Sequence, residues 1–128
     1  MTKIPVATPV KRGIVYVMEN LCNTEEVRVG HHTTSNEQRE REVSFGVGEN
    51  WNVVFSVTIE SKLKATAVEH VAHALFDRYA HKRESGDDSG HNRTVYHCSR
   101  VKARNAIKRA ITILSQDLRI KVLSLEED

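Results

Sequence analysis

Two short alternating segments near the N-terminus place the strongest constraint on the fold of this 128-residue chain. The first, about residues 12–18, is rich in β-branched residues and puts Tyr16 on one face and Val15 and Val17 on the other. The second, about residues 26–31, alternates in the same way. Because only a short polar linker separates the segments, we predict that they pair as an antiparallel hairpin.

The rest of the chain alternates between the periods of strands and helices. Ser35 or Asn36 is a good helix cap, and Ser99 is another. The expected elements after the hairpin are a short helix from about residue 36 to the glycines at 46 and 48, a strand over 52–59, a helix over 64–82, a strand over 93–98 and a helix over 100–114. Residues 83–91 have the composition of a loop. The pattern predicts an α+β fold, a small and mainly antiparallel sheet flanked by helices.

Composition narrows the class of protein. Hydrophobic residues make up 39% of the chain and charged residues 28%, as in ordinary soluble domains, and the length suits a single domain over 1–128. Residues 1–11 resemble an irregular arm, and residues 118–128 form a tail that fits a helix or a strand equally well. No apolar run reaches bilayer length and the N-terminus lacks a signal-peptide core, so we expect a cytoplasmic protein without a membrane partner. Cys22 and Cys98 make no disulfide framework, and we expect both to be reduced.

The hairpin also carries a motif. Residues 13–16 followed by residues 28–30 resemble the two signature motifs of the GIY-YIG endonucleases, in their phage-encoded and restriction-like branches. Arg39 stands where that family has an arginine on the next helix. The glutamate, histidine and aromatic residue of a later helix are matched by Glu69, His73 and Phe76. The resemblance extends over about residues 13–115 and depends on the order and spacing of short motifs.

The resemblance implies a Mg²⁺-dependent DNA endonuclease, in which Mn²⁺ can substitute. Tyr16 would be the general base, and Glu69 would hold one partly hydrated metal ion. A phenol needs a nearby cation to act as a base, and Arg28, which replaces the tyrosine of the second motif, is expected to supply it. Arg39 would counter phosphate charge and His31 would pass protons. We expect the fold to gather Tyr16, Arg28, His31 and Arg39 on one side of the sheet.

Further polar residues are candidates for contact with the substrate. Arg41 competes with Arg39 for the same role, since both lie in a charged helix whose i, i+4 pairs also suit a solvated face. His73 lies one turn from Glu69, and the two could be a plain surface pair. The expected substrate contacts are Arg41, His73, Asn92, Arg93, Lys102 and Arg104. A nuclease of this size has no separate DNA-binding domain, so a homodimer is one way to enlarge its footprint, and the branch suggests a phage or prokaryotic setting.

Two other functions remain open from the sequence. One is a nucleic-acid-binding module that keeps the fold without catalysis, which the replacement of the second tyrosine by Arg28 favours. The other is a zinc-binding structural protein, because the chain has seven histidines and a His97–Cys98 pair, although none of the spacings is diagnostic.

Overall fold

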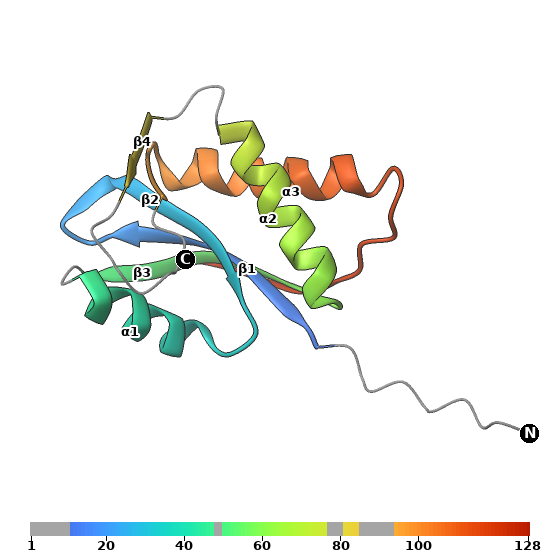
Figure 1. Ribbon diagram of the computed structural model, residues 1–128, viewed down its shortest axis with the longest axis horizontal. Coiled ribbons are helices and arrows are strands. Elements are labelled where there is room, and N and C mark those ends of the chain that lie inside the picture. Colours follow the sequence, from blue (N-terminus) through green and yellow to red (C-terminus); the bar gives the residue numbers. More distant parts are fainter. Residues whose placement is uncertain (1–10, 48–49, 77–80, 85–93) are drawn as a thin grey trace, which may run out of the picture.

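A central antiparallel sheet organises the molecule (Figure 1). The computed structural model describes residues 11–47, 50–76, 81–84 and 94–128. Its strands are β1 (Gly13–Asn20), β2 (Asn23–His32), β3 (Trp51–Ile59), β4 (His81–Glu84), β5 (Thr94–His97) and β6 (Val122–Glu127), in the spatial order β4-β5-β2-β1-β3-β6. All the pairings are antiparallel. The predicted α+β class and the β1–β2 hairpin are therefore confirmed.

Helices cover both faces of the sheet (Figure 1). Helix α1 (Asn36–Val47) lies on one face, and α2 (Lys62–Phe76) and α3 (Arg100–Leu114) lie together on the other. The side-chain oxygens of Ser35 and Ser99 accept hydrogen bonds from the amides of Gln38 and Lys102, so each serine satisfies a donor in the first turn of its helix. The cap predicted at Ser99 is confirmed, and at the first helix Ser35 rather than Asn36 has that role.

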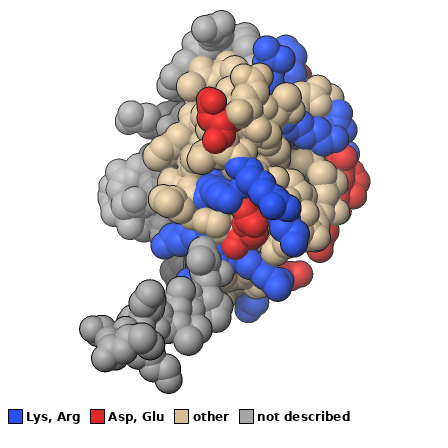
Figure 2. Space-filling model, turned by 90° about the vertical axis from the view of Figure 1, so that its right-hand side faces the viewer, with Lys and Arg blue, Asp and Glu red and all other residues tan. Residues whose placement is uncertain are grey.

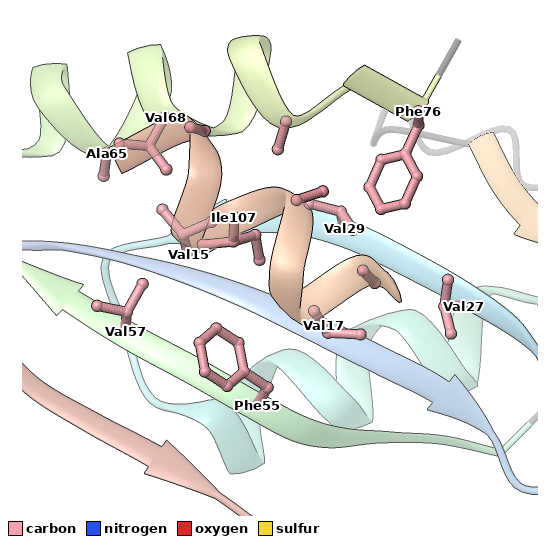
Figure 3. Close-up of a cluster of buried hydrophobic side chains, with 14 of the residues drawn as sticks. Val15, Val17, Val27, Val29, Phe55, Val57, Ala65, Val68, Phe76 and Ile107 are labelled. Atoms are coloured by element: carbon pink, nitrogen blue, oxygen red, sulfur yellow. The ribbon is translucent and has the colours of Figure 1, made fainter. Parts of the chain in front are cut away.

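The larger core fills the space between the sheet and the two helices α2 and α3 (Figure 3). Val15 and Val17 of β1 point into it, together with Phe55 of β3, Val68 of α2 and Ile107 of α3. A smaller cluster lies on the opposite face, the face that α1 covers, and consists of Tyr16, Met18, Trp51 and Val95. The alternation predicted along β1 thus separates two buried layers.

Two glycines allow close contacts that a side chain would prevent. A Cβ atom at Gly13 would collide with Ala65, so the start of β1 can lie against the first turns of α2. A Cβ atom at Gly30 would lie 2.5 Å from the Tyr16 hydroxyl oxygen and 2.8 Å from Cζ of the same ring. Tyr16 and Gly30 are directly paired across the hairpin, so the phenol ring occupies the space that glycine leaves.

The structure corrects two boundaries. The helix predicted over 64–82 is α2, which ends at Phe76 within the described residues, and residues 81 and 82 belong to strand β4 instead. Residues 83 and 84, predicted to be loop, extend the same strand. This short polar strand has no alternating pattern of its own; its conformation depends on pairing with β5, which sequence periodicity does not reveal.

The C-terminal tail, for which the sequence favoured neither state, forms strand β6 and pairs with β3 at the edge of the sheet. The amide of Asp128 donates to the carbonyl of Val54 at 3.0 Å. In the part of the chain that the structure describes, no helix is long and apolar enough to cross a membrane.

Candidate functional site

Tyr16 and Arg39 form a buried pair beneath α1. The hydroxyl oxygen of Tyr16 accepts a hydrogen bond from Nε of Arg39 at 2.9 Å. Only 2% of Tyr16 and 7% of Arg39 are exposed. β1 positions the phenol opposite Gly30, and the first turn of α1 places the arginine over the same face. A cation and a phenol thus meet where little water reaches them, which strengthens their interaction.

Burial and charge act on Tyr16 in opposite directions. Burial disfavours the phenolate and raises the pKa of Tyr16 above its ordinary value of 10.0. The positive charge and hydrogen bond of Arg39 lower this pKa, and the charge of Arg28 lowers it further, while the carboxylate of Glu69 raises it. Arg39 therefore supports the phenolate more strongly than Arg28, the residue that the sequence indicated for this task.

Two more basic side chains lie on the α1 face. Arg28 is 3% exposed, and its guanidinium carbon lies 5.5 Å from the centre of the Trp51 ring, in the geometry of a cation–π contact. The His32 ring centre lies 5.4 Å from that of Tyr16. Nε2 of His32 lies 2.9 Å from Oδ1 of Asn36, whose amide group donates to Ser56, so these contacts tie β2 to α1 and β3.

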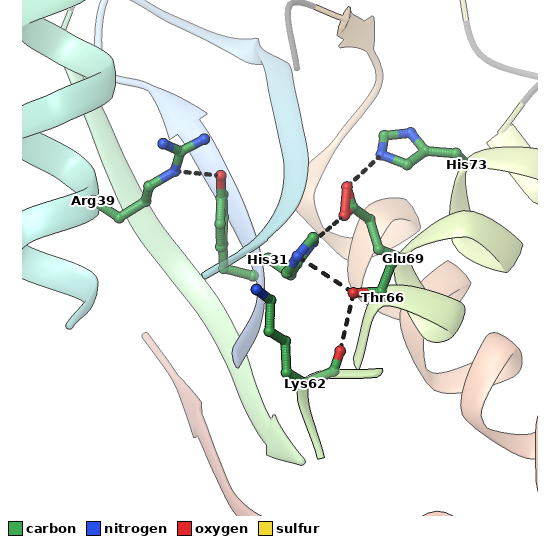
Figure 4. A network of polar contacts seen from close by, with 7 residues as sticks. His31, Arg39, Lys62, Thr66, Glu69 and His73 are labelled. Carbon is green, nitrogen blue, oxygen red and sulfur yellow. Dashed lines mark hydrogen bonds and ion pairs between the residues drawn. The ribbon is translucent and has the colours of Figure 1, made fainter. Parts of the chain in front are cut away.

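A second polar cluster lies on the opposite face, between β2 and α2 (Figure 4). Glu69 is at its centre, with Oε2 2.6 Å from Nδ1 of His31 and Oε1 3.6 Å from Nε2 of His73. His73 is hydrogen-bonded through Nδ1 to the hydroxyl of Tyr96, and the Oγ1 atom of Thr66 lies 3.4 Å from Nε2 of His31. The chain of contacts thus runs from β5 through α2 to β2.

Glu69 is held in its charged form. Burial alone would raise its pKa, but hydrogen bonds and charge from His31 and His73 outweigh burial and bring the pKa down to about 2. The carboxylate side chain is only 10% exposed, whereas His31 is 26% exposed. Glu69 therefore remains ionised at neutral pH, and His31 is the member of the cluster that lies toward solvent.

Strand register divides the predicted site. Tyr16 pairs with Gly30, and Val15 pairs with His31, so His31 points to the α2 face while Tyr16 points to the α1 face. The expectation that Tyr16, Arg28, His31 and Arg39 lie on one side is correct for three of them and wrong for His31. The reason is the period of two along β2, which sends neighbouring side chains to opposite faces.

The two faces meet at an edge. Strand β5 pairs with β2 only at Glu26 and Val27. Beyond these residues, no other described strand pairs with the outer edge of β2, up to its end at His32. The end of β2 is therefore an open edge beside both clusters, and the charge of Glu69 is the smallest of the influences on the pKa of Tyr16, which it raises.

The predicted substrate contacts are scattered. Arg41 is exposed on α1, and Lys102 is exposed in the first turn of α3. Arg104 forms an ion pair with Glu127 at 2.8 Å, which joins α3 to β6. His73 belongs to the Glu69 cluster. Asn92 and Arg93 lie outside the described residues.

The zinc and magnesium hypotheses differ in the number of protein ligands that each metal needs. Within residues 11–47, 50–76, 81–84 and 94–128, no group of three or more His, Cys, Asp and Glu side chains is arranged to hold a metal ion. Zinc usually takes three or four protein ligands, whereas magnesium often takes one carboxylate and completes its shell with water and phosphate oxygens. The ionised Glu69, whose Oε1 is only loosely engaged by His73, fits the magnesium pattern.

Three members of the two clusters, His32, Thr66 and Tyr96, are not among the residues that the sequence predicted for the nuclease site. His32 could have been found by counting two residues on from Gly30, since that places it beside Tyr16. Thr66 could have been found by counting three residues back from Glu69 along the helix. Nothing in the local sequence marks Tyr96, because β5 brings it to His73 only in the folded chain.

Comparison with protein-family models, with curated proteins and with solved structures finds no match to this chain.

Proposed function

We propose that this protein is a Mg²⁺-dependent endonuclease that hydrolyses DNA phosphodiester bonds. The observation that carries the proposal is a buried, ionised carboxylate, Glu69, on one face of a hairpin whose other face holds a tyrosine hydrogen-bonded to an arginine. The negative charge of Glu69 influences the pKa of Tyr16. A metal-binding carboxylate and a proton acceptor are groups that enzymes use to hydrolyse phosphodiesters.

Each side chain has a defined task in the proposed reaction. Glu69 would hold Mg²⁺, which when bound would neutralise charge on the phosphate and the departing oxygen. His31 is a positioning residue, because its Nδ1 fixes Oε2 of Glu69 while the ring remains partly open to solvent. Thr66 supports the ring from its other nitrogen, at 3.4 Å.

Tyr16 would accept the proton of the attacking water. Its oxygen already receives a hydrogen bond from Arg39, an interaction that becomes stronger when the phenol is deprotonated. Since the pKa of Tyr16 is raised, the phenolate is a small fraction at neutral pH and increases about tenfold per pH unit below that pKa. The proposed activity should therefore rise with pH across the neutral and mildly alkaline range.

The burial of Tyr16 favours a second candidate, a nucleic-acid-binding module without catalysis. A side chain with 2% exposure reaches a water molecule only if α1 or the end of β2 moves. In this alternative, the Tyr16–Arg39 and Glu69–His31 pairs stabilise the hairpin, and DNA binds without being cleaved.

A cleavage assay separates the two candidates. Supercoiled, linear, nicked and branched DNA are incubated with the wild-type protein, Glu69→Ala, Tyr16→Phe and the exposed-site control Glu37→Ala, in Mg²⁺ and in Mn²⁺. We expect cleavage by the wild type and by the control. Glu69→Ala and Tyr16→Phe should each lose about a hundredfold or more, the usual loss when one preorganised electrostatic group is removed.

Two outcomes contradict the proposal. If no substrate is cleaved by wild-type protein that binds DNA, the binding module is the better description. If cleavage survives in Glu69→Ala, the activity belongs to other residues or to a contaminant.

A further inference from the structure

Basic side chains collect where three segments of the chain meet, at the junction between β3 and α2. The carbonyl of Lys11 accepts from the amide of Lys62 at 2.7 Å, and the carbonyl of Lys121 accepts from the amide of Glu60 at 3.1 Å. The ammonium group of Lys64 donates to the carbonyl of Arg119 at 2.6 Å. These contacts bring the approach to β1, the start of α2 and the approach to β6 together at one end of the sheet.

We call the exposed basic residues of this junction the sheet-end patch; they are Lys11, Arg12, Lys62, Arg119 and Lys121. The acidic side chain within it, Glu60, is paired at 2.6 Å with the neighbouring Lys64. None of these five basic residues forms an ion pair with a described acidic side chain. Figure 2 shows this side of the molecule, with blue side chains surrounding a red one near the middle of the face. The patch therefore carries an excess positive charge directed toward solvent.

The patch lies next to the Glu69 cluster. Lys62 begins α2, and its carbonyl accepts a hydrogen bond from Thr66 one turn later, the same threonine that lies 3.4 Å from His31. Figure 4 shows the Lys62 side chain turned toward the hairpin that carries His31. A polyanion bound along the patch would therefore lead directly to the ionised carboxylate of the proposed site.

We propose that the sheet-end patch binds the phosphate backbone of duplex DNA and leads the strand to the His31–Glu69 cluster. This inference deepens the proposed function and rests on it for the choice of DNA over other polyanions. It also replaces the earlier expectation for Arg104, whose guanidinium is engaged by Glu127. Leu63, 80% exposed between two lysines, would lie against the sugars or the groove.

Duplex binding measured without divalent metal tests the patch separately from cleavage. A fluorescently labelled 20-base-pair duplex is titrated with wild-type protein, with Lys62→Glu/Lys121→Glu and with the control Lys108→Glu/Arg109→Glu, which reverses two exposed charges on α3. Anisotropy is recorded in EDTA from 50 to 200 mM salt. Thermal melts verify that all three proteins are folded.

The patch variant should bind at least about tenfold more weakly and show a salt slope smaller by about two, since each lost phosphate contact removes about 0.9 from the slope. The control should change less than about threefold. Equal affinity of the patch variant and the wild type would overturn the inference. The inference would also be overturned if the wild-type protein did not bind the duplex but bound vesicles containing phosphatidylserine, because the patch would then recognise a lipid surface.

The patch and the proposed hydrolysis can fail independently. If the wild type cleaves DNA and the patch variant binds DNA as tightly as the wild type, the proposed role of the patch is wrong and the proposed hydrolysis stands. If the patch variant binds DNA more weakly and the wild type cleaves no substrate, the proposed role of the patch stands and the proposed hydrolysis is wrong.

Discussion

The two faces of the β1–β2 hairpin solve the burial of polar groups in different ways. On the α1 face, Tyr16 and Arg39 are almost fully enclosed, and burial keeps the tyrosine protonated. On the α2 face, two histidines keep the buried carboxylate of Glu69 ionised, and one of them reaches solvent. Adjacent residues, Gly30 and His31, serve opposite faces. The enclosed α1 face favours the protonated form of Tyr16, and the partly open α2 face leaves the carboxylate of Glu69 able to bind a cation.

The largest effect should come from removing the charge on the α2 face. The folded pKa of Glu69 is lowered to about 2 from an ordinary value of 4.5, so its stabilising contribution is present above pH 4.5 and is lost as the pH falls toward 2. Glu69→Gln should therefore lower the free energy of unfolding by about 3 kcal/mol at pH 7.

Urea unfolding at pH 7 and pH 3 measures this effect. The gap between the wild type and Glu69→Gln should shrink by about half or more at pH 3, because the wild type itself has lost part of the contribution. Glu37→Gln, at an exposed position on α1, serves as the control. A gap that stays constant with pH would mean that packing, not charge, accounts for the loss.

A substitution at Gly30 should disrupt the packing of Tyr16 on the α1 face. In Gly30→Ala the new methyl group would collide with the ring of Tyr16, so we expect a loss of about 1–3 kcal/mol in the free energy of unfolding. The same change made in a Tyr16→Ala background should cost clearly less, because the obstructing ring is gone. Equal costs in both backgrounds would show that the collision is relieved elsewhere.

Tyr16→Phe should have a smaller effect on stability. It removes the acceptor of the Arg39 Nε–H group, and the loss of such a hydrogen bond costs about 1–2 kcal/mol. Because the folded pKa is raised, Tyr16 contributes stability below pH 10 that is lost as the pH rises through the folded pKa. The phenolate absorbance that develops above pH 10 should be smaller in the variant by the contribution of one tyrosine.

The smallest effect distinguishes two neighbouring histidines. His31→Ala should raise the pKa of Glu69 back toward 4.5, because its strongest hydrogen bond is lost, whereas His32→Ala should leave that pKa in place. Carboxyl-carbon NMR titration of Glu69 measures both. Equal shifts in the two variants would contradict the division of the hairpin into two faces.

Local patterns were sufficient to predict most of the fold. The alternation through Tyr16 and the helical period that predicts α2 each reflect contacts that a single element makes with the core, and both agree with the structure. Strands β4 and β6 could not be predicted in this way. Each depends on pairing with a strand from another part of the chain, and β4 has no alternating pattern of its own, so the local sequence does not reveal them.

Part of the candidate site could be predicted residue by residue, but its arrangement could not. Tyr16, Arg39 and Glu69 were identified from motif order, and the structure places the first two in contact. The assignment of His31 to the face of Tyr16 is wrong because His31 lies three residues from Arg28 along β2, and the alternation of a strand sends the two side chains to opposite faces. The sheet-end patch was invisible in sequence, since its members come from residues 11–12, 62 and 119–121 and meet only at the folded junction.

The hairpin and the sheet-end patch depend on contacts of very different sequence separation. The hairpin that carries Tyr16 and His31 closes over a short loop, whereas β6 pairs with β3 across more than sixty intervening residues, from Ile59 to Val122. Arg119 and Lys121 take their places only when that last strand docks. We therefore expect the hairpin to form before the junction that assembles the sheet-end patch.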